Sequence, residues 1–236
     1  MMCSPNTQKK LEFYFYKIGS FMFYLVQEKM MIQSKKDYLF YLEADRLSSG
    51  IQRKRPLPLI GDEIWKFQRL LRHREYWNNC LKNKSILHKL YYHYIVIKFH
   101  RYSLKLGISI PINVFGPGLA IVHYNAIVVS SSAKIGENCR IHACVNIGHQ
   151  DGNAPKIGDN VYIGPGAKIY GDVKIADGIA IGTNSVVNKS FLQPNISIAG
   201  VPAKKISDKG SLRFITKGTG ILRSQADSKN INLLKS

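Results

Sequence analysis

Three histidines in the middle of the chain, His123, His142 and His149, are the side chains best suited to acid–base chemistry. An imidazole titrates near neutral pH and can take a proton from a hydroxyl group. His123 lies six residues before Val129 and shares the phase of an aliphatic core position. Because an unpaired imidazole in a core is costly, we expect His123 to sit at a distorted or exposed place, as a general base. A structural histidine with satisfied hydrogen bonds is the alternative.

The other two histidines have weaker claims. His149 opens a segment, residues 148–154, that interrupts the repeat described below, and such loops commonly carry function. It is therefore a candidate catalytic residue or substrate contact, with an exposed loop histidine as the alternative. His142 follows a central aliphatic residue, where most repeats have glycine, so we expect an exposed corner. Cys139, His142, Cys144 and His149 together suggest zinc, but Cys139 faces inward and cannot converge with a corner residue, so we expect no metal site.

An aliphatic residue recurs every six residues through the middle of the chain. The central positions are Val129, Ile135, Ile141, Ile147, Ile157, Ile163, Ile169, Ile175, Ile181 and Val187. Glycine often follows this residue, and a small or apolar residue stands two positions before it. The phase breaks once, because Ile147 and Ile157 are ten residues apart, which implies an insertion of four residues.

A period of six matches neither a helix, with 3.6 residues per turn, nor a plain strand, with two. It fits a solenoid with three short strands per turn, in which six residues make one flat side and one corner. Asn138, Asn160 and Asn184 suit corners that need a positive φ. The expected fold class is mainly β, a left-handed parallel β-helix of hexapeptide repeats with an α-helical N-terminal region. The insertion must leave this prism as a loop.

We divide the chain into three regions. Residues 1–106 are expected to be helical, because apolar residues recur at three- and four-residue spacing in 11–32 and 61–90. Residues 107–206 form the β-helix, and residues 207–236 form a loose polar tail. The aromatic stretch 13–32 lacks an uncharged run long enough to span a membrane. Packing within the protein is preferred for it, and peripheral association with a membrane stays open.

The chain of 236 residues carries a formal net charge of +19. Such a charge attracts nucleic acid, an anionic membrane surface or a phosphorylated cofactor. No nucleic-acid-binding signature is present, so we expect no nucleic-acid partner. The four cysteines lack disulfide or zinc spacing, and no secretory signal stands out. We therefore expect a cytoplasmic protein that works near a membrane.

Three segments resemble the hexapeptide-repeat acyltransferases, and within them the serine acetyltransferase branch. Residues 123–129 read HYNAIVV, residues 155–169 read PKIGDNVYIGPGAKI, and residues 199–204 read AGVPAK. The helical region looks more like that of related proteins associated with bacterial surface-polysaccharide synthesis. The resemblance implies a homotrimer with acyl-CoA bound between neighbouring prisms. It also implies direct transfer of an acetyl group from acetyl-CoA to an acceptor hydroxyl, with His123 as the general base.

Three glycine-containing corners should stack along one edge, one coil apart: Gly164-Pro165, Gly182-Thr183 and Gly200-Val201. That edge would offer a straight groove for the pantetheine arm of acetyl-CoA. Lys204 and Lys205 follow at the open end and could meet its phosphates. Corner geometry alone also explains the glycines, and solvated surface charge also explains the lysines.

The chain departs from the serine-specific pattern where a free amino acid would be held. Val122 stands where those members carry Asp, and Asn153-Ala154 stands where they carry Arg-His. No Asp or Glu lies between Glu75 and Glu137, so the expected partner of the imidazole is Asp151, an acid of the helical region or a backbone carbonyl.

These departures favour an uncharged acceptor. We therefore expect an O-acetyltransferase that acts on a sugar of a surface-polysaccharide precursor. A serine O-acetyltransferase of cysteine biosynthesis, with L-serine as acceptor, is the first alternative. A non-catalytic trimeric hexapeptide scaffold is the second, and binding of acetyl-CoA would separate it from the other two.

Overall fold

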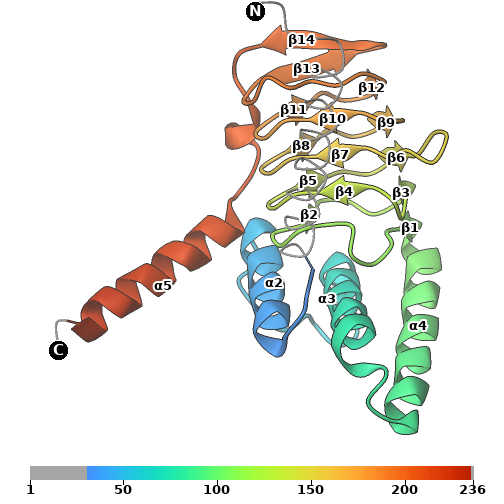
Figure 1. The fold of residues 1–236 in the computed structure, drawn as a ribbon, viewed down its shortest axis with the longest axis vertical. Coiled ribbons are helices and arrows are strands. Elements are labelled where there is room, and N and C mark those ends of the chain that lie inside the picture. Colours follow the sequence, from blue (N-terminus) through green and yellow to red (C-terminus); the bar gives the residue numbers. More distant parts are fainter. Residues whose placement is uncertain (1–30, 235–236) are drawn as a thin grey trace, which may run out of the picture. The chain divides into compact units, whose positions relative to one another are not determined.

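The computed structural model describes residues 31–234, and Figure 1 shows how helices and strands are arranged in them. Residues from Ile32 onward form one compact unit. The aromatic stretch 13–32 and the helix expected at 11–32 lie outside the described residues, apart from their last two positions. None of the helices within residues 31–234 has the length and apolarity needed to cross a membrane.

Helices α2 (Lys35–Ser48), α3 (Glu63–Tyr76) and α4 (Ile86–Leu106) precede the strands, with a π-helical turn at Trp77–Leu81. The Oγ of Ser34 caps α2 by accepting from the backbone N–H of Asp37 at 3.1 Å. Ser85 caps α4 in the same way, and Gly107 ends it with φ 63°. The helical pattern expected over 61–90 is therefore interrupted at residues 82–85, where a new cap begins α4.

Short strands then wind into a parallel β-helix (Figure 1). They are β1 (Ile108–Ser109), β2 (Ala120–Ile121), β3 (Ile127–Val129), β4 (Lys134–Ile135), β5 (Arg140–Ile141), β6 (Asn146–Gly148), β7 (Lys156–Ile157), β8 (Tyr162–Ile163), β9 (Lys168–Tyr170), β10 (Lys174–Ile175), β11 (Ala180–Ile181), β12 (Val186–Val187), β13 (Ser197–Gly200) and β14 (Ala203–Ser207). Successive strands from β2 to β11 belong in turn to three sheets, ordered β1-β3-β6-β9-β12, β10-β7-β4 and β14-β13-β11-β8-β5-β2. The fold predicted from the six-residue period is confirmed.

The interior is a stack of aliphatic side chains held in register by the ladders. Ile121, Ile141, Ile163, Ile181 and Ile198 lie one above another in the sheet that contains β5 and β8. All five are buried. The expected positive φ at the corner asparagines is also present, with 53° at Asn138, 57° at Asn160 and 54° at Asn184. Each corner therefore turns without disturbing the next aliphatic layer.

The four-residue insertion leaves the prism as a small hairpin after β6, which projects from the coil in Figure 1. Gln150 and Asn153 exchange two backbone hydrogen bonds of 2.8 and 2.9 Å. Asp151 and Gly152 form its tip with φ of 51° and 80°. An Asp-Gly pair is typical of this two-residue turn, because both positions need a positive φ.

The C-terminal region is not the loose tail that its polar composition suggested. After β14, which is antiparallel to β13, come a 3-10 turn at Ser211–Arg213 and helix α5 (Gly218–Leu234). The N–H of Gly218 donates to the Oγ of Ser48 at 3.1 Å, and the N–H of Thr219 donates to the Oδ1 of Asn138 at 3.1 Å. These contacts join residues far apart in the sequence, so a pattern of nearby residues could not predict them.

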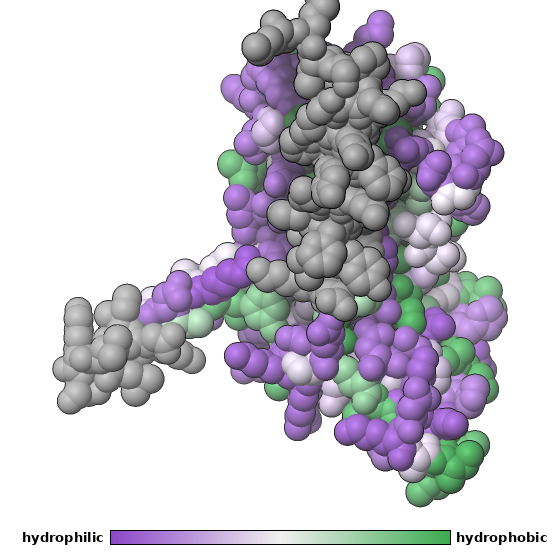
Figure 2. Space-filling model, in the orientation of Figure 1, coloured by the Kyte–Doolittle hydropathy of each residue, from purple (hydrophilic) through white to green (hydrophobic). Residues whose placement is uncertain are grey.

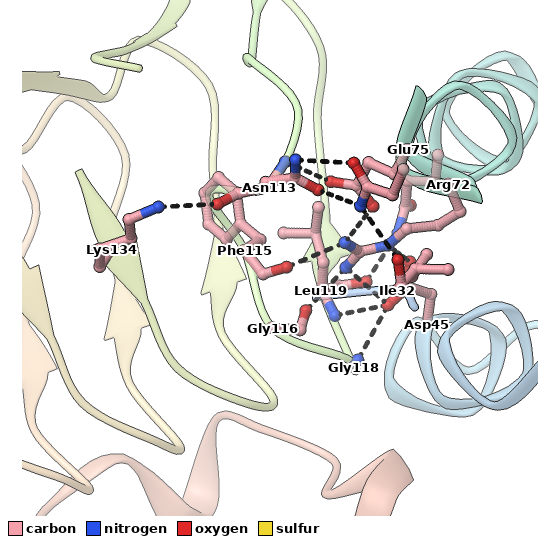
Figure 3. A network of polar contacts seen from close by, with 12 residues as sticks. Ile32, Asp45, Arg72, Glu75, Asn113, Phe115, Gly116, Gly118, Leu119 and Lys134 are labelled. Carbon is pink, nitrogen blue, oxygen red and sulfur yellow. Dashed lines mark hydrogen bonds and ion pairs between the residues drawn. The ribbon is translucent and has the colours of Figure 1, made fainter. Parts of the chain in front are cut away.

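A buried polar network joins the helices to the first coil of the β-helix (Figure 3). The Arg72 guanidinium donates to Asp45 at 2.8 and 3.2 Å and to Glu75 at 3.0 Å. It also donates to the carbonyl oxygens of Phe115 and Gly116. The Asp45 Oδ1 in turn accepts from the backbone N–H groups of residues 118 and 119 at 2.8 and 2.9 Å. Helices α2 and α3 are thus tied to the segment that leads into β2.

Candidate active site

One corner of the prism gathers most of the expected site residues. Strands β2, β5, β8, β11 and β13 are in register, with their central isoleucines aligned. The second residue after each of these isoleucines therefore falls in one column, which we call the His123 edge: His123, Ala143, Pro165, Thr183 and Gly200. Backbone hydrogen bonds along the column keep it aligned, for example Asn184 N–H to the carbonyl of Pro165 at 2.8 Å.

His123 does not occupy the aliphatic slot that its six-residue spacing suggested. The core residue of its coil is Ile121, which is buried, whereas His123 is exposed. Ile121 and Val129 are eight residues apart, two more than the regular six-residue step between central positions. The extra length is taken up at Asn125 and Ala126, which have φ of 92° and 52°. The imidazole therefore lies at an enlarged corner, open to solvent.

His142 is the histidine nearest to His123 in the structure. Their ring centroids are 6.0 Å apart, and the two planes are tilted by 54°. The expectation of an exposed His142 is wrong, because this residue is half-buried. Its ring packs edge to face with that of Tyr162, with centroids 5.2 Å apart. The sequence analysis gave His142 little weight as a site residue. The signal that could have found it is the pairing of Ile141 with Ile121, because this pairing places His142 on the coil next to that of His123.

Burial determines the electrostatics of His142. Within residues 31–234 its Nε2 is buried and has no hydrogen-bond partner. The pKa of His142 is lowered to about 4, chiefly by burial and to a smaller extent by the charges of Arg140 and His123. Tyr162 also stacks on Phe214, with ring centroids 4.6 Å apart. The rings of His123, His142, Tyr162 and Phe214 therefore form a row on the outer face of the sheet. His142 is thus a neutral neighbour of His123 at neutral pH.

The structure brings none of the expected carboxylates to His123. Asp151 lies in the hairpin after β6, at a different corner. Asp45 and Glu75 are buried and bonded to Arg72. Among the residues that the structure describes, no acid lies within hydrogen-bond or ion-pair distance of the His123 ring.

His149 lies apart from His123 within one chain. It follows β6, at the corner that leads to β7, whereas His123 follows β2 at the corner that leads to β3. The exposed His149 ring has its Nδ1 3.4 Å from the Oγ of Ser130, a residue of the preceding coil. The two histidines proposed for catalysis do not form one constellation in a single chain.

The expected cofactor corners do stack along the His123 edge. Gly164 and Gly182 are equivalent positions, because Ile163 pairs with Ile181. A Cβ on Gly164 would lie 2.8 Å from the carbonyl oxygen of Ile181, and one on Gly182 would lie 2.8 Å from the Cβ of Ala199. Gly200 is offset by one residue and aligns with Thr183 instead. Glycine is thus required at positions 164 and 182 by the close approach of the coils.

The two lysines after the last corner differ in their surroundings. Both lie on β14, and Lys204 pairs with Ala199 in the ladder. Lys205 Nζ forms an ion pair with Asp208 at 2.5 Å and donates to Gln193 at 3.0 Å. Lys204 is exposed and has no ion pair with any residue in 31–234.

The described part of the chain holds no group of three or more His, Cys, Asp or Glu side chains that could bind a metal ion.

Comparisons with known proteins agree with this geometry. Residues 154–189 match the family described as bacterial transferase hexapeptide (six repeats). A serine acetyltransferase of Staphylococcus aureus strain Mu50 is 36% identical over 100 residues, which are 40% of this chain and 46% of that protein. The chain thus spans about half the length of the curated relatives it matches.

Solved structures give the same picture over a longer stretch. The serine acetyltransferase of Neisseria gonorrhoeae superposes with a TM-score of 0.58 at 27% identity, covering 76% of this chain and 69% of that one. Its complex with serine gives a TM-score of 0.57 at 26% identity, covering 74% and 71%. The fold and the repeats resemble those of the bacterial hexapeptide transferases, whose family model matches residues 154–189. The Staphylococcus aureus and Neisseria gonorrhoeae proteins to which the chain is similar are both serine acetyltransferases.

Proposed function

We propose that this chain is an acetyl-CoA-dependent O-acetyltransferase with His123 as its general base and a sugar of a surface-polysaccharide precursor as its acceptor. The observation that carries the proposal is the position of His123. It is exposed on the same edge as Pro165 and Thr183, in a chain similar to serine acetyltransferases.

The chemistry follows from an exposed imidazole. A hydroxyl attacks a thioester poorly until a base removes its proton, and a positioned histidine typically contributes about 10²–10⁴-fold to such a step. His123 takes the hydroxyl proton while the new C–O bond forms and the C–S bond breaks, and the departing thiolate then receives that proton. Negative charge develops on the thioester oxygen during this attack and needs hydrogen-bond donors. The N–H groups of Gly164 and Gly182 already donate to the carbonyls of Ile181 and Ile198, so they are not those donors.

The residues that stand where serine-specific enzymes hold a charged amino acid favour an uncharged acceptor. Val122 precedes the histidine, and neither it nor Ala154, which is buried, can bind a charged amino acid group. Asn153 is held by its backbone in the hairpin. The second candidate is serine O-acetylation, which the names of the relatives support. A trimeric scaffold without catalysis is the third.

We infer a homotrimer, as the resemblance to hexapeptide acyltransferases implies. His123 and His149 lie at different corners of one prism, so only a neighbouring copy would bring a His149 side chain close to His123. Acetyl-CoA would lie along the His123 edge, with Lys204 near its phosphates. We place the protein in the cytoplasm, since Cys80, Cys139 and Cys144 are free thiols.

The test is release of CoA from acetyl-CoA with L-serine, simple hexoses, N-acetylhexosamines and nucleotide sugars as acceptors. His123→Ala is compared with the wild type, and His100→Ala, at an exposed histidine of α4, serves as the control. We expect turnover with a sugar that His123→Ala lowers by at least about a hundredfold and His100→Ala leaves unchanged. Turnover with L-serine alone would make the chain a serine acetyltransferase. Failure to bind acetyl-CoA would leave the scaffold.

A further inference from the structure

Helix α4 is apolar on two opposite faces. Its inner face packs on α3, where Phe99 stacks on Phe67 at 5.2 Å. Its outer face carries large apolar side chains that are between 55% and 71% exposed: Ile86, Leu87, Leu90, Tyr94, Ile97 and Leu104. From Leu87 to Ile97 they recur every three or four residues, and Leu104 follows two helical turns later, so they lie along one stripe. In Figure 2 hydrophobic atoms gather at the lower end of the molecule, where α4 begins.

Positive charge borders this stripe. Residues 86–106 contain Lys89, Lys98, Arg101 and Lys105 and no Asp or Glu. At 3.6 residues per turn, Lys89 falls on one side of the stripe and Lys98 and Lys105 fall on the other, while Arg101 lies within it. Lys105 is 3.8 Å from Glu63, whereas Lys98 lies against the ring of Tyr94. The outer face is therefore apolar along its middle and basic at its margins.

We propose that the outer face of α4 is a docking surface for an anionic lipid bilayer. Aliphatic and aromatic side chains flanked by Lys and Arg are the pattern of a helix that lies in the membrane interface, and each basic residue near such a surface adds to the attraction. A second copy of this chain is a poorer occupant. Two α4 helices face to face would bring Lys98 and Arg101 against their own copies with no acid on either helix.

This inference is independent of the proposed enzymatic activity. The stripe lies on a helix whose inner face contacts α3, and α3 is tied through Arg72 to the coil before β2. Docking needs no rearrangement of that inner face, because the stripe is already exposed. The proposed contact is peripheral, with α4 lying along the surface of the bilayer.

The test is co-sedimentation of the full chain with two kinds of vesicle: phosphatidylcholine alone, and phosphatidylcholine mixed with phosphatidylglycerol. The apolar variant Leu90→Gln/Ile97→Gln and the charge variant Lys98→Gln/Arg101→Gln change the stripe. Leu59→Gln/Ile60→Gln, at two residues each 86% exposed, and Lys174→Gln/Lys189→Gln, at exposed lysines of the β-helix, are the matched controls. Far-ultraviolet circular dichroism checks that each variant is folded.

We expect the wild type and both controls to bind the anionic vesicles and to lose binding as salt rises. Each stripe variant should bind more weakly, by about thirtyfold for the loss of two charges. Equal binding by the charge variant and its control would mean that the net charge of the whole chain causes the attraction, and the proposal would fall. It would also fall if nothing bound, or if Leu90→Gln/Ile97→Gln only dissociated an assembly of this chain, which would make the stripe an interface between copies.

Discussion

The imidazole rings of His123 and His142 lie 6.0 Å apart, yet one is exposed and the other half-buried. Burial lowers the pKa of His142 to about 4, so this ring is neutral at neutral pH. His142 therefore adds no positive charge beside His123.

The lowered pKa of His142 makes the fold sensitive to acid. In the unfolded chain this histidine binds a proton below about pH 6.5, whereas in the fold it does so only near pH 4. The unfolded state binds more protons between these values, so stability is fully present above about pH 6.5 and is lost as pH falls through this window. We expect the melting temperature of His142→Gln to fall less than that of the wild type on acidification. His149→Gln, at an exposed histidine, should follow the wild type, and identical curves for all three proteins would contradict the burial effect.

Gly148 is the last residue of β6 and Gly164 directly follows β8, but the space around the two glycines differs. A Cβ on Gly164 would lie 2.8 Å from the carbonyl oxygen of Ile181, whereas one on Gly148 would come no closer than 3.4 Å to any atom. We expect Gly164→Ala to lower the free energy of unfolding by about 1–3 kcal/mol. Gly148→Ala should change it by less than about 0.5 kcal/mol. Denaturant titration measures both, and an equal cost would show that coil spacing does not set the requirement for glycine.

Arg72 neutralises two buried carboxylates, those of Asp45 and Glu75. Arg72→Met would leave both acids without their cation, and removal of one partner from a buried ion pair typically costs about 3–5 kcal/mol. The exposed Arg55→Met serves as the control and should stay within about 0.5 kcal/mol of the wild type. Chemical denaturation followed by circular dichroism provides the comparison. A stable Arg72→Met protein would mean that the helices are held to the first coil mainly by apolar contacts.

Lys204 and Lys205 offer a matched test of the cofactor edge. If CoA phosphates lie at this end, Lys204→Gln should raise the KM for acetyl-CoA by about tenfold at low salt, because one charge-assisted contact is lost. Lys205 is already paired with Asp208, so Lys205→Gln should have a smaller effect. Steady-state kinetics at two salt concentrations would measure both. If Lys205→Gln has the larger effect, the phosphates lie elsewhere.

The solenoid could be predicted from the sequence because its period is local. Each aliphatic centre meets its equivalent one turn away, so spacing alone carries the register, as Ile157 and Ile175 show. The same counting gave His123 the phase of a core position, because the step from His123 to Val129 happens to be six, whereas the cost of burying an unpaired imidazole predicted the exposed place where it lies. The two extra residues before Val129 become visible only when Ile121 is seen to pair with Ile141.

Contacts between distant parts of the chain had no such signal. Tyr162 covers part of His142, and Thr219 is anchored to Asn138, a residue 81 positions earlier. The composition of residues 207–236 gives no indication that Thr219 would bind Asn138. The failed expectations for His142 and for the C-terminal region therefore share a cause, which is tertiary packing on the outer face of the prism.

Strand β14 returns antiparallel on β13 and so ends the parallel ladder. A parallel stack left open at its last coil would offer free N–H and C=O groups to another chain and could grow end to end into a fibre. Here the final edge belongs to a strand in which Lys204 and Lys205 are exposed, and charged edge strands discourage such pairing. The reversal of five residues thus sets the length of the solenoid and keeps its growth finite.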